Sequence, residues 1–234
     1  MRVRTWTPLI WALCAGTAFA AISTAEMNRL RDSANVVREL RDMPEKGIPE
    51  DLWNRADCVV VIPSMKKAAF GIGGEYGRGV MSCRHANAWS APLFMTLAKG
   101  TWGLQIGAEQ VDLVLLVMNE RGAEKMLQDN ISLGADVSVA AGPVGRSGTA
   151  STDAQFSAEI LSYSRAAGVF AGIDLSGGVL KPDKDSNTDV YGPGHVARDI
   201  VMGQGVAVPA AANDFMRSLS SEARATTGKR PRGN

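Results

Sequence analysis

The chain has 234 residues, 45% of them hydrophobic and 21% charged, which is enough apolar material for a packed core and too much for a disordered protein. Its 25 Lys and Arg residues nearly balance 24 Asp and Glu residues, so the surplus of cations that nucleic-acid binding needs is missing. Glycine is over-represented, with 25 residues, many in stretches that otherwise have the pattern of strands. We therefore predict one folded domain with no nucleic-acid partner.

The N-terminal residues have the pattern of a secretory signal. Arg2 and Arg4 precede an apolar run over 8–15, and Ala18-Phe19-Ala20 supplies an A-x-A cleavage site. The run is shorter than the ~20 residues of a membrane span, and Leu13 stands where lipid attachment at Cys14 would need a small residue. We predict a signal peptide over 1–20 and a periplasmic or secreted protein, peripheral to a membrane where it meets one.

Two cysteines remain after such a cleavage, Cys58 and Cys83. In an oxidising compartment they could form a disulfide. They could equally be two buried thiols, because Cys58 opens the apolar run over 59–62. The sequence leaves both alternatives open.

The periodicity of apolar residues predicts an α+β fold. Spacings of three and four residues indicate an amphipathic helix over 24–41, within an N-terminal region over 21–48, and short helices over 49–56, after Asn119 and after Pro209. Strand patterns occupy the middle of the chain, over 58–62, 68–84 (as a Gly-rich hairpin), 101–108, 111–118, 133–141, 158–165, 169–175 and 178–181. We expect a Gly-rich antiparallel sheet, as a sandwich or partly closed barrel, with helices at both ends and a disordered basic tail over 226–234.

Motifs for catalysis or cofactor binding fail on inspection. The run 71–76 begins like a dinucleotide fingerprint, but Tyr76 occupies the third glycine position. The run 183–189 begins like a calcium loop, but Thr188 replaces the required glycine, so a turn that caps a helix is the better interpretation. His85 and His195 have no nucleophile motif beside them. We expect no catalytic residue, no metal and no cofactor.

An apolar run with aromatic residues, over 89–102, leads into a strand whose other face is nearly bare, and cationic residues lie near the strand ends. One interpretation is an apolar pocket or lip with cations at its rim, which would hold an acyl chain and its phosphate. The other is a core strand with ordinary surface charges. The headgroup candidates are Lys66, Lys67, Arg78, Lys99 and Arg146, and the acyl or interface candidates are Trp89, Phe94 and Trp102. Arg146 could instead pair with a buried carboxylate such as Asp112.

Several short motifs occur in an order that resembles one known family. They are CVVVIP (58–63), the Gly-rich run over 70–79, WSAP (89–92), GLQIG (103–107), GPVGR (142–146), YS (163–164), GVFAG (168–172) and NTDVY (187–191). Together they resemble the SYLF domain family, also described as the actin-binding domain of fungal endocytic proteins. The resemblance covers about Asp51 to Gly192, within a domain that we place at 49–225.

The resemblance implies a lipid-binding module that prefers phosphoinositides in eukaryotic members and uses an amphipathic helix at its start for membrane contact. Here the helix over 24–41 offsets four arginines with four acidic residues, so it lacks a polybasic face. We expect an exported, bacterial-type member that binds anionic phospholipid or another envelope lipid at a membrane surface, without enzymatic activity, and we do not expect actin as a partner. The alternatives are a structural or stress-related envelope protein without a ligand, and a lipid hydrolase, which would need His85 or His195 against a serine and a carboxylate.

Overall fold

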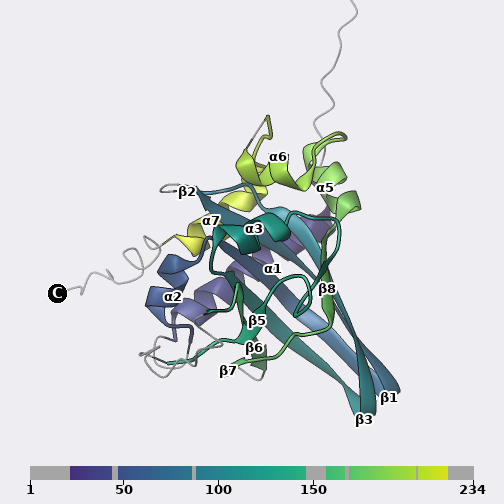
Figure 1. Ribbon diagram of the computed structural model, residues 1–234. Helices are drawn as coiled ribbons and strands as arrows, with labels where there is room; N and C mark the ends of the chain where they lie inside the picture. Colours follow the sequence, from purple (N-terminus) through teal and green to yellow (C-terminus); the bar gives the residue numbers. More distant parts are fainter. Residues whose placement is uncertain are drawn as a thin grey trace, which may run out of the picture.

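The computed structural model describes residues 22–43, 47–85, 88–145, 157–166, 169–203 and 205–220, without the side chains of 69–72, 101–108 and 170. A curled, mostly antiparallel sheet is covered by helices from both ends of the chain (Figure 1). This confirms the predicted α+β class and the helices at both ends. The predicted signal peptide and the predicted basic tail lie outside the described residues.

Two very long strands form the centre of the sheet. Strand β1 (Cys58–His85) and strand β3 (Leu93–Val117) pair antiparallel from Cys58↔Val117 to Met81↔Leu93, with irregularities after Ile62 and Phe70. Figure 1 shows the two strands extending together to one corner of the molecule. The two ends of β1 nevertheless meet, because the Arg84 amide donates to the Asp57 carbonyl at 2.7 Å. The β1–β3 ribbon is therefore folded back on itself.

Our prediction of a separate strand over 58–62 and a hairpin over 68–84 was wrong, since both belong to β1. The glycines that indicated a hairpin serve close packing instead. A Cβ atom at Gly77 would lie 2.4 Å from Cγ2 of Ile62, and one at Gly79 would lie 2.1 Å from the carbonyl oxygen of Val61. The second half of β1 thus packs directly on the first half, where a side chain would keep them apart.

Shorter strands extend the ribbon on both sides. Strand β6 (Ile160–Ala166) pairs with the end of β3. Strand β7 (Val169–Gly172) pairs antiparallel with β6, and β5 (Val139–Ala141) pairs parallel with it. Strand β8 (Gly178–Pro182) pairs with the start of β3, β4 (Ile131–Ser132) pairs with β8, and β2 (Ala88–Trp89) pairs with the end of β1. The strand predicted over 133–141 is interrupted, because Gly134 has a φ of +90° and begins a turn between β4 and β5.

The helices lie close to their predicted positions. Helix α1 (Thr24–Arg41) has the predicted bounds and is capped by Ser23, whose hydroxyl accepts from the Ala25 amide. Helices α2 (Glu50–Arg55) and α3 (Glu120–Lys125) follow Pro49 and Asn119 as expected. The last elements are α5 (Lys184–Tyr191), α6 (Ala197–Met202), the 3₁₀ helix η2 (Ala210–Ala212) and α7 (Asn213–Leu219).

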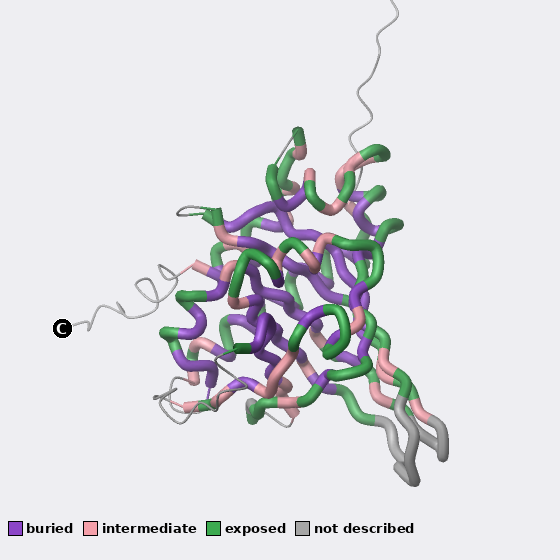
Figure 2. The backbone as a smooth tube through the Cα atoms, in the orientation of Figure 1, coloured by how far each residue is buried: buried purple, intermediate pink, exposed green. Residues whose placement is uncertain are grey.

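The sheet buries apolar side chains on both faces, in two core clusters. Figure 2 shows that buried residues run through the centre of the molecule. On one face, α1 and α7 pack against residues such as Val61, Val80 and Phe94, which form the first core cluster. On the other face, Cys58, Met81 and Leu115 belong to a second cluster that includes Met126, after α3, and Ile200 of α6. None of the helices in the described part of the chain combines the length and the hydropathy needed to cross a bilayer.

Candidate functional site

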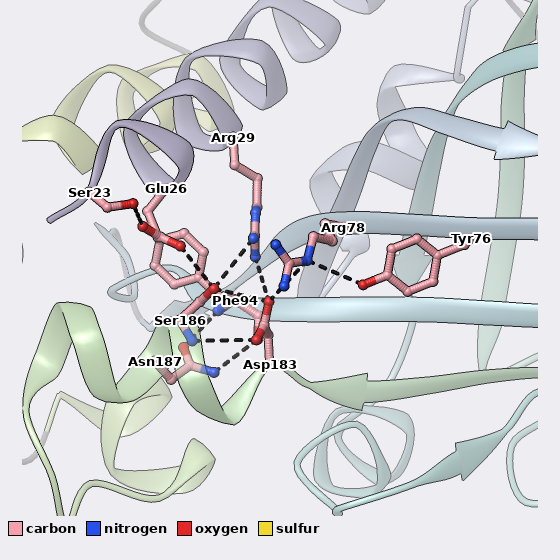
Figure 3. Close-up of polar contacts among 9 residues, drawn as sticks. All are labelled: Ser23, Glu26, Arg29, Tyr76, Arg78, Phe94, Asp183, Ser186 and Asn187. Carbon is pink, nitrogen blue, oxygen red and sulfur yellow. Dashed lines mark hydrogen bonds and ion pairs between the residues drawn. The ribbon is translucent and has the colours of Figure 1, made fainter.

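A buried polar cluster joins the start of α1 to the sheet and to α5 (Figure 3). Its centre is the ion pair between Arg29 Nη1 and Asp183 Oδ2, 3.0 Å apart, with side chains only 5% and 6% exposed. Arg29 also donates to the hydroxyl of Ser186, which in turn donates to Glu26. We call Glu26, Arg29, Asp183 and Ser186 the polar node.

The local sequence explains why these groups meet. Asp183 directly follows β8 and caps α5, where its side chain accepts from the Ser186 amide. Four residues on, the side-chain oxygen of Asn187 accepts from the Phe94 amide at 2.9 Å, and its nitrogen donates to the Phe94 carbonyl at 2.9 Å. The Arg29 guanidinium lies 5.2 Å from the centre of the Phe94 ring. The node therefore holds α1, α5 and β3 in one arrangement.

The carboxylates of the node are stabilised in their ionised form. Burial acts to raise the pKa of Asp183 and is the largest single influence, but the hydrogen bonds from Arg29 and Ser186 outweigh it and lower the pKa. For Glu26, burial is again opposed by hydrogen bonds, from Ser23 and Ser186, and its pKa is also lowered. Because the node keeps its charges paired and buried, its geometry suits a structural role better than proton transfer.

Arg78 connects this node to the protein surface. Its Nε atom lies 3.7 Å from Asp183 Oδ2 and donates to the hydroxyl of Tyr76 at 3.2 Å, while half of its side chain is exposed. The hydrogen bond with Tyr76 is the main reason that the pKa of Arg78 is raised. A guanidinium in this position is fixed by the protein on one side and faces solvent on the other.

An uncovered part of the sheet lies beside Arg78. The strand register aligns Tyr76, Ala98 and Val179 in one cross-strand row and Arg78, Thr96 and Lys181 in the next. Because cross-strand partners point to the same face, these side chains share one surface. Tyr76 is 49% and Val179 is 36% exposed, and Ala98 and Lys181 are exposed as well. We call Tyr76, Arg78, Ala98, Val179 and Lys181 the open face.

The predicted headgroup cations do not converge on one site. Lys66 and Arg78 are exposed, but Lys67 and Lys99 belong to the other side of their strands. Lys67 lies 3.8 Å from Glu75, and Lys99 donates to the carbonyl of Asp174 at 3.2 Å. The reason is the alternation of side chains along a strand, which separates neighbours such as Lys66 and Lys67. Arg146 lies outside the described residues.

The structure gives two of the predicted lipid-contacting aromatics a different role. Trp89 is 5% exposed beneath the Arg84 guanidinium, and Phe94 is fully buried beneath Arg29. Both belong to the first core cluster, so they stabilise the fold and do not line an acyl pocket in this conformation. The side chain of Trp102 lies outside what the structure describes.

One open question from the sequence is answered, because Cys58 and Cys83 form a disulfide that joins the two ends of β1. Asp112 pairs with Arg165 of β6, and the suggested partner Arg146 lies outside the described residues. Burial raises the pKa of Asp112, although the Ser64 amide donates to its carboxylate. This cluster fastens β3 to β6 and to Glu39 of α1.

Sequence reasoning missed Arg29, Asp183 and Lys181. A signal for Arg29 was present, since it lies beside Leu30 on the stripe of α1 that also includes Ser33 and Val37. A charged residue on a buried stripe indicates a buried partner. Lys181 could be assigned to a face only once the register of β8 against β3 was known.

The histidines do not form a hydrolytic site in the described part of the chain. His85 Nε2 lies 2.7 Å from the carbonyl oxygen of Val201. Among described residues, neither His85 nor His195 has a hydrogen bond to a serine or a carboxylate. The triad geometry that a lipid hydrolase would need is therefore not found there.

The fold thus combines a buried polar node with an exposed sheet surface beside it. Residues 98–222 match the family model described as "Ysc84: Las17-binding protein actin regulator", and the chain belongs to this family. This confirms the resemblance to the SYLF domain family seen in the sequence.

Curated relatives come from fungi and mammals. The SH3 domain-containing protein PJ696.02 of Schizosaccharomyces pombe is 37% identical over 180 residues, 75% of this chain and 41% of its own length. LAS seventeen-binding protein 3 of Saccharomyces cerevisiae is 34% identical over 181 residues, 75% of this chain and 39% of its own. The human SH3 domain-containing YSC84-like protein 1 is 31% identical over 198 residues, 82% of this chain and 57% of its own. The chain thus spans about half the length of the curated relatives it matches.

These findings correct one expectation. We did not expect actin as a partner, but the family description names an actin regulator and a Las17-binding protein, and one relative is named for binding LAS seventeen. The family description and one relative's name denote binding or regulation, and the other two names denote SH3 domain-containing proteins. The names therefore point toward protein partners, including actin.

Proposed function

We propose that this domain is a non-enzymatic binding module whose open face associates with an anionic lipid surface. The observation that carries the proposal is that two cations, Arg78 and Lys181, lie beside Tyr76 and Val179 on one exposed part of the sheet. Neither of the two cross-strand rows contains an acidic residue, and the carboxylate that Arg78 faces, Asp183, is buried and also paired with Arg29. Cations beside an exposed tyrosine suit the boundary between phosphate headgroups and acyl chains.

The expected association is weak and depends on salt. A cation close to an anionic leaflet contributes about 1 kcal/mol, so Arg78 and Lys181 together contribute ~2 kcal/mol, or about a thirtyfold preference over a neutral surface. The proposal thus differs from the acyl pocket inferred from the sequence, because Trp89 and Phe94 are buried. Adsorption through surface charges and Tyr76 takes its place.

Vesicle co-sedimentation tests this proposal. The protein is mixed with vesicles of phosphatidylcholine alone and with vesicles in which about a third of the lipid is phosphatidylglycerol. We expect Arg78→Gln/Lys181→Gln to remove most of the additional pelleting caused by the anionic lipid. The control Arg121→Gln/Arg217→Gln changes the net charge by the same amount outside the open face, at side chains that are 80% and 75% exposed. This control should keep the additional pelleting. Equal pelleting of both variants would contradict a role for the open face.

A protein ligand is the second candidate, and the family description favours it. The open face is also suited to a protein surface, since a Cβ atom at the neighbouring Gly100 would contact nothing within 4 Å. Co-sedimentation with actin filaments, with the same two double variants, distinguishes the candidates. Pelleting with filaments but with neither kind of vesicle would assign the open face to actin in place of lipid.

We also propose that the protein is exported. The A-x-A sequence at 18–20 and the Cys58–Cys83 disulfide support this, because disulfides persist in oxidising compartments. N-terminal sequencing of the protein isolated from its native host should give Ala21 as the first residue. A protein that keeps Met1 or Arg2 would contradict export by cleavage of this signal.

A further inference from the structure

A hollow beside the Cys58–Cys83 disulfide is lined by residues of α3 and α6, on the face of the sheet that belongs to the second core cluster. Its volume is about 370 Å³. One wall is a single face of α3 and the residues just after it, with Glu120, Ala123, Glu124 and Leu127 at helical spacing. The other wall is formed by Arg198, Val201 and Met202 of α6. We call this hollow the α3–α6 groove.

Part of the groove's lining is apolar. It includes the disulfide-bonded Cys58 and Cys83, Leu127 and the buried Val201. Met202 is 48% exposed, which is unusual for a large apolar side chain on a short helix. An exposed methionine beside buried aliphatic groups provides an adaptable surface for another apolar side chain.

The α3 wall of the groove is acidic. Glu120 and Glu124 are exposed there, and Asp57 lies just before β1, while Arg84 and Arg198 are the arginines in the lining. Arg84 does not neutralise them fully, because its guanidinium stacks on Trp89 at 4.4 Å and donates to the carbonyl of Trp53. Within the part of the chain that the structure describes, no ion pair is found for Glu120, Glu124 or Arg198.

We infer that the α3–α6 groove is a docking site for a basic peptide segment of a partner protein, one that presents a Lys or Arg next to an aliphatic residue. The cation would lie between Glu120 and Glu124, which are one helical turn apart, and the aliphatic side chain would cover the disulfide and Met202. Arg198 faces them from the opposite wall and selects the direction of the segment by attracting a carbonyl or carboxylate oxygen. The groove belongs to the other face of the sheet from the open face, so this inference is independent of the proposed function.

Peptide binding to the full chain tests the inference. The probe is a fluorescent peptide with alternating arginine and leucine residues, and the readout is its anisotropy. We expect Glu120→Gln/Glu124→Gln to weaken binding about tenfold, which is the size expected for two exposed ion pairs. Asp185→Asn/Asp189→Asn is the matched control, since these two exposed carboxylates are also four residues apart, on α5. This control should leave the affinity unchanged.

Four results would overturn the inference in whole or in part. The first is no binding of the arginine–leucine peptide, and the second is equal weakening by the two double variants, which would indicate a general charge effect. The third concerns the chain's own basic segment after residue 220, which carries Arg224, Lys229, Arg230 and Arg232. If replacing these four residues by glutamine raises the peptide affinity tenfold or more, the groove's occupant is that segment and not a partner. A peptide with serine in place of leucine should bind more weakly, and equal binding would exclude the apolar contact.

Discussion

The α-carbon of Gly79 lies so close to Val61 that a Cβ atom built on it would be 2.1 Å from the Val61 carbonyl oxygen. Both residues belong to β1, so one half of this strand packs on the other with no side chain between them. The clash involves backbone atoms, which cannot move aside as a flexible side chain can. This contact determines how tightly the β1–β3 ribbon folds.

Gly79→Ala should therefore destabilise the protein by about 3 kcal/mol, the upper range for an overpacked interior. The measurement is the free energy of unfolding from urea denaturation monitored by tryptophan fluorescence. Gly100→Ala is the control, because a Cβ atom there meets nothing within 4 Å, and its effect should be under about 1 kcal/mol. Equal free energies of unfolding for the two variants would show that the two halves of β1 can move apart at Gly79 without loss of stability.

A second prediction concerns the ion pair between Arg29 and Asp183. Arg29→Met leaves a buried carboxylate with only Ser186 and the more distant Arg78 as partners, so we expect a loss of about 3 kcal/mol. Asp183→Asn, measured alone and together with Arg29→Met, completes a double-mutant cycle. A coupling energy near zero in that cycle would mean that the two side chains stabilise the fold independently.

The elements that were predicted correctly are those determined by local sequence. Helix α1 has its predicted bounds because a single apolar stripe and the cap residue Ser23 define it without reference to the rest of the chain. The segment 183–189 was predicted as a turn that caps a following helix. Asp183 caps a helix there, but the residues of the expected turn belong to that helix, α5.

The features that were missed depend on contacts between distant residues. The glycines in the GPVGR and Gly-rich motifs have no local signature that distinguishes a turn from close packing. Gly142, for example, is required because a Cβ atom there would lie 2.0 Å from the ring of Tyr163, 21 positions further along the chain. The candidate cations failed to converge for a similar reason, since the two sides of β1 can be assigned only when its partner and register are known.

Acid should destabilise the protein at a defined pH. The pKa values of Glu26, Asp183 and Glu159 are all lowered in the folded protein, in each case because hydrogen bonds outweigh burial, the largest single influence. Groups with lowered pKa values contribute stability above the pKa of the unfolded chain, and this is lost as the pH falls through the folded value. Asp112, whose pKa is raised by burial, opposes the trend only in part.

We therefore expect the midpoint of thermal unfolding to fall once the pH drops below about 4.5, the ordinary value of a glutamate. Glu159→Gln should make this fall less steep, since it removes a carboxylate that accepts from Lys125 and from the Ser138 amide. The exposed Asp189→Asn serves as control. A fall of the same steepness in Glu159→Gln and in the unmodified protein would show that this carboxylate does not couple stability to pH.

The disulfide provides the last prediction. Cys58 and Cys83 are 25 positions apart. A disulfide that closes a loop of this length restricts the unfolded chain and contributes about 3 kcal/mol to the free energy of unfolding. The double variant Cys58→Ala/Cys83→Ala should lose that amount in urea denaturation, and a reducing agent should destabilise the unmodified protein but not the variant. The two halves of β1 are also held by the Arg84–Asp57 hydrogen bond and by the packing at Gly79, so the variant should still fold. If the unmodified protein is as stable with the reducing agent as without it, the disulfide adds no stability beyond the other contacts of the folded ribbon.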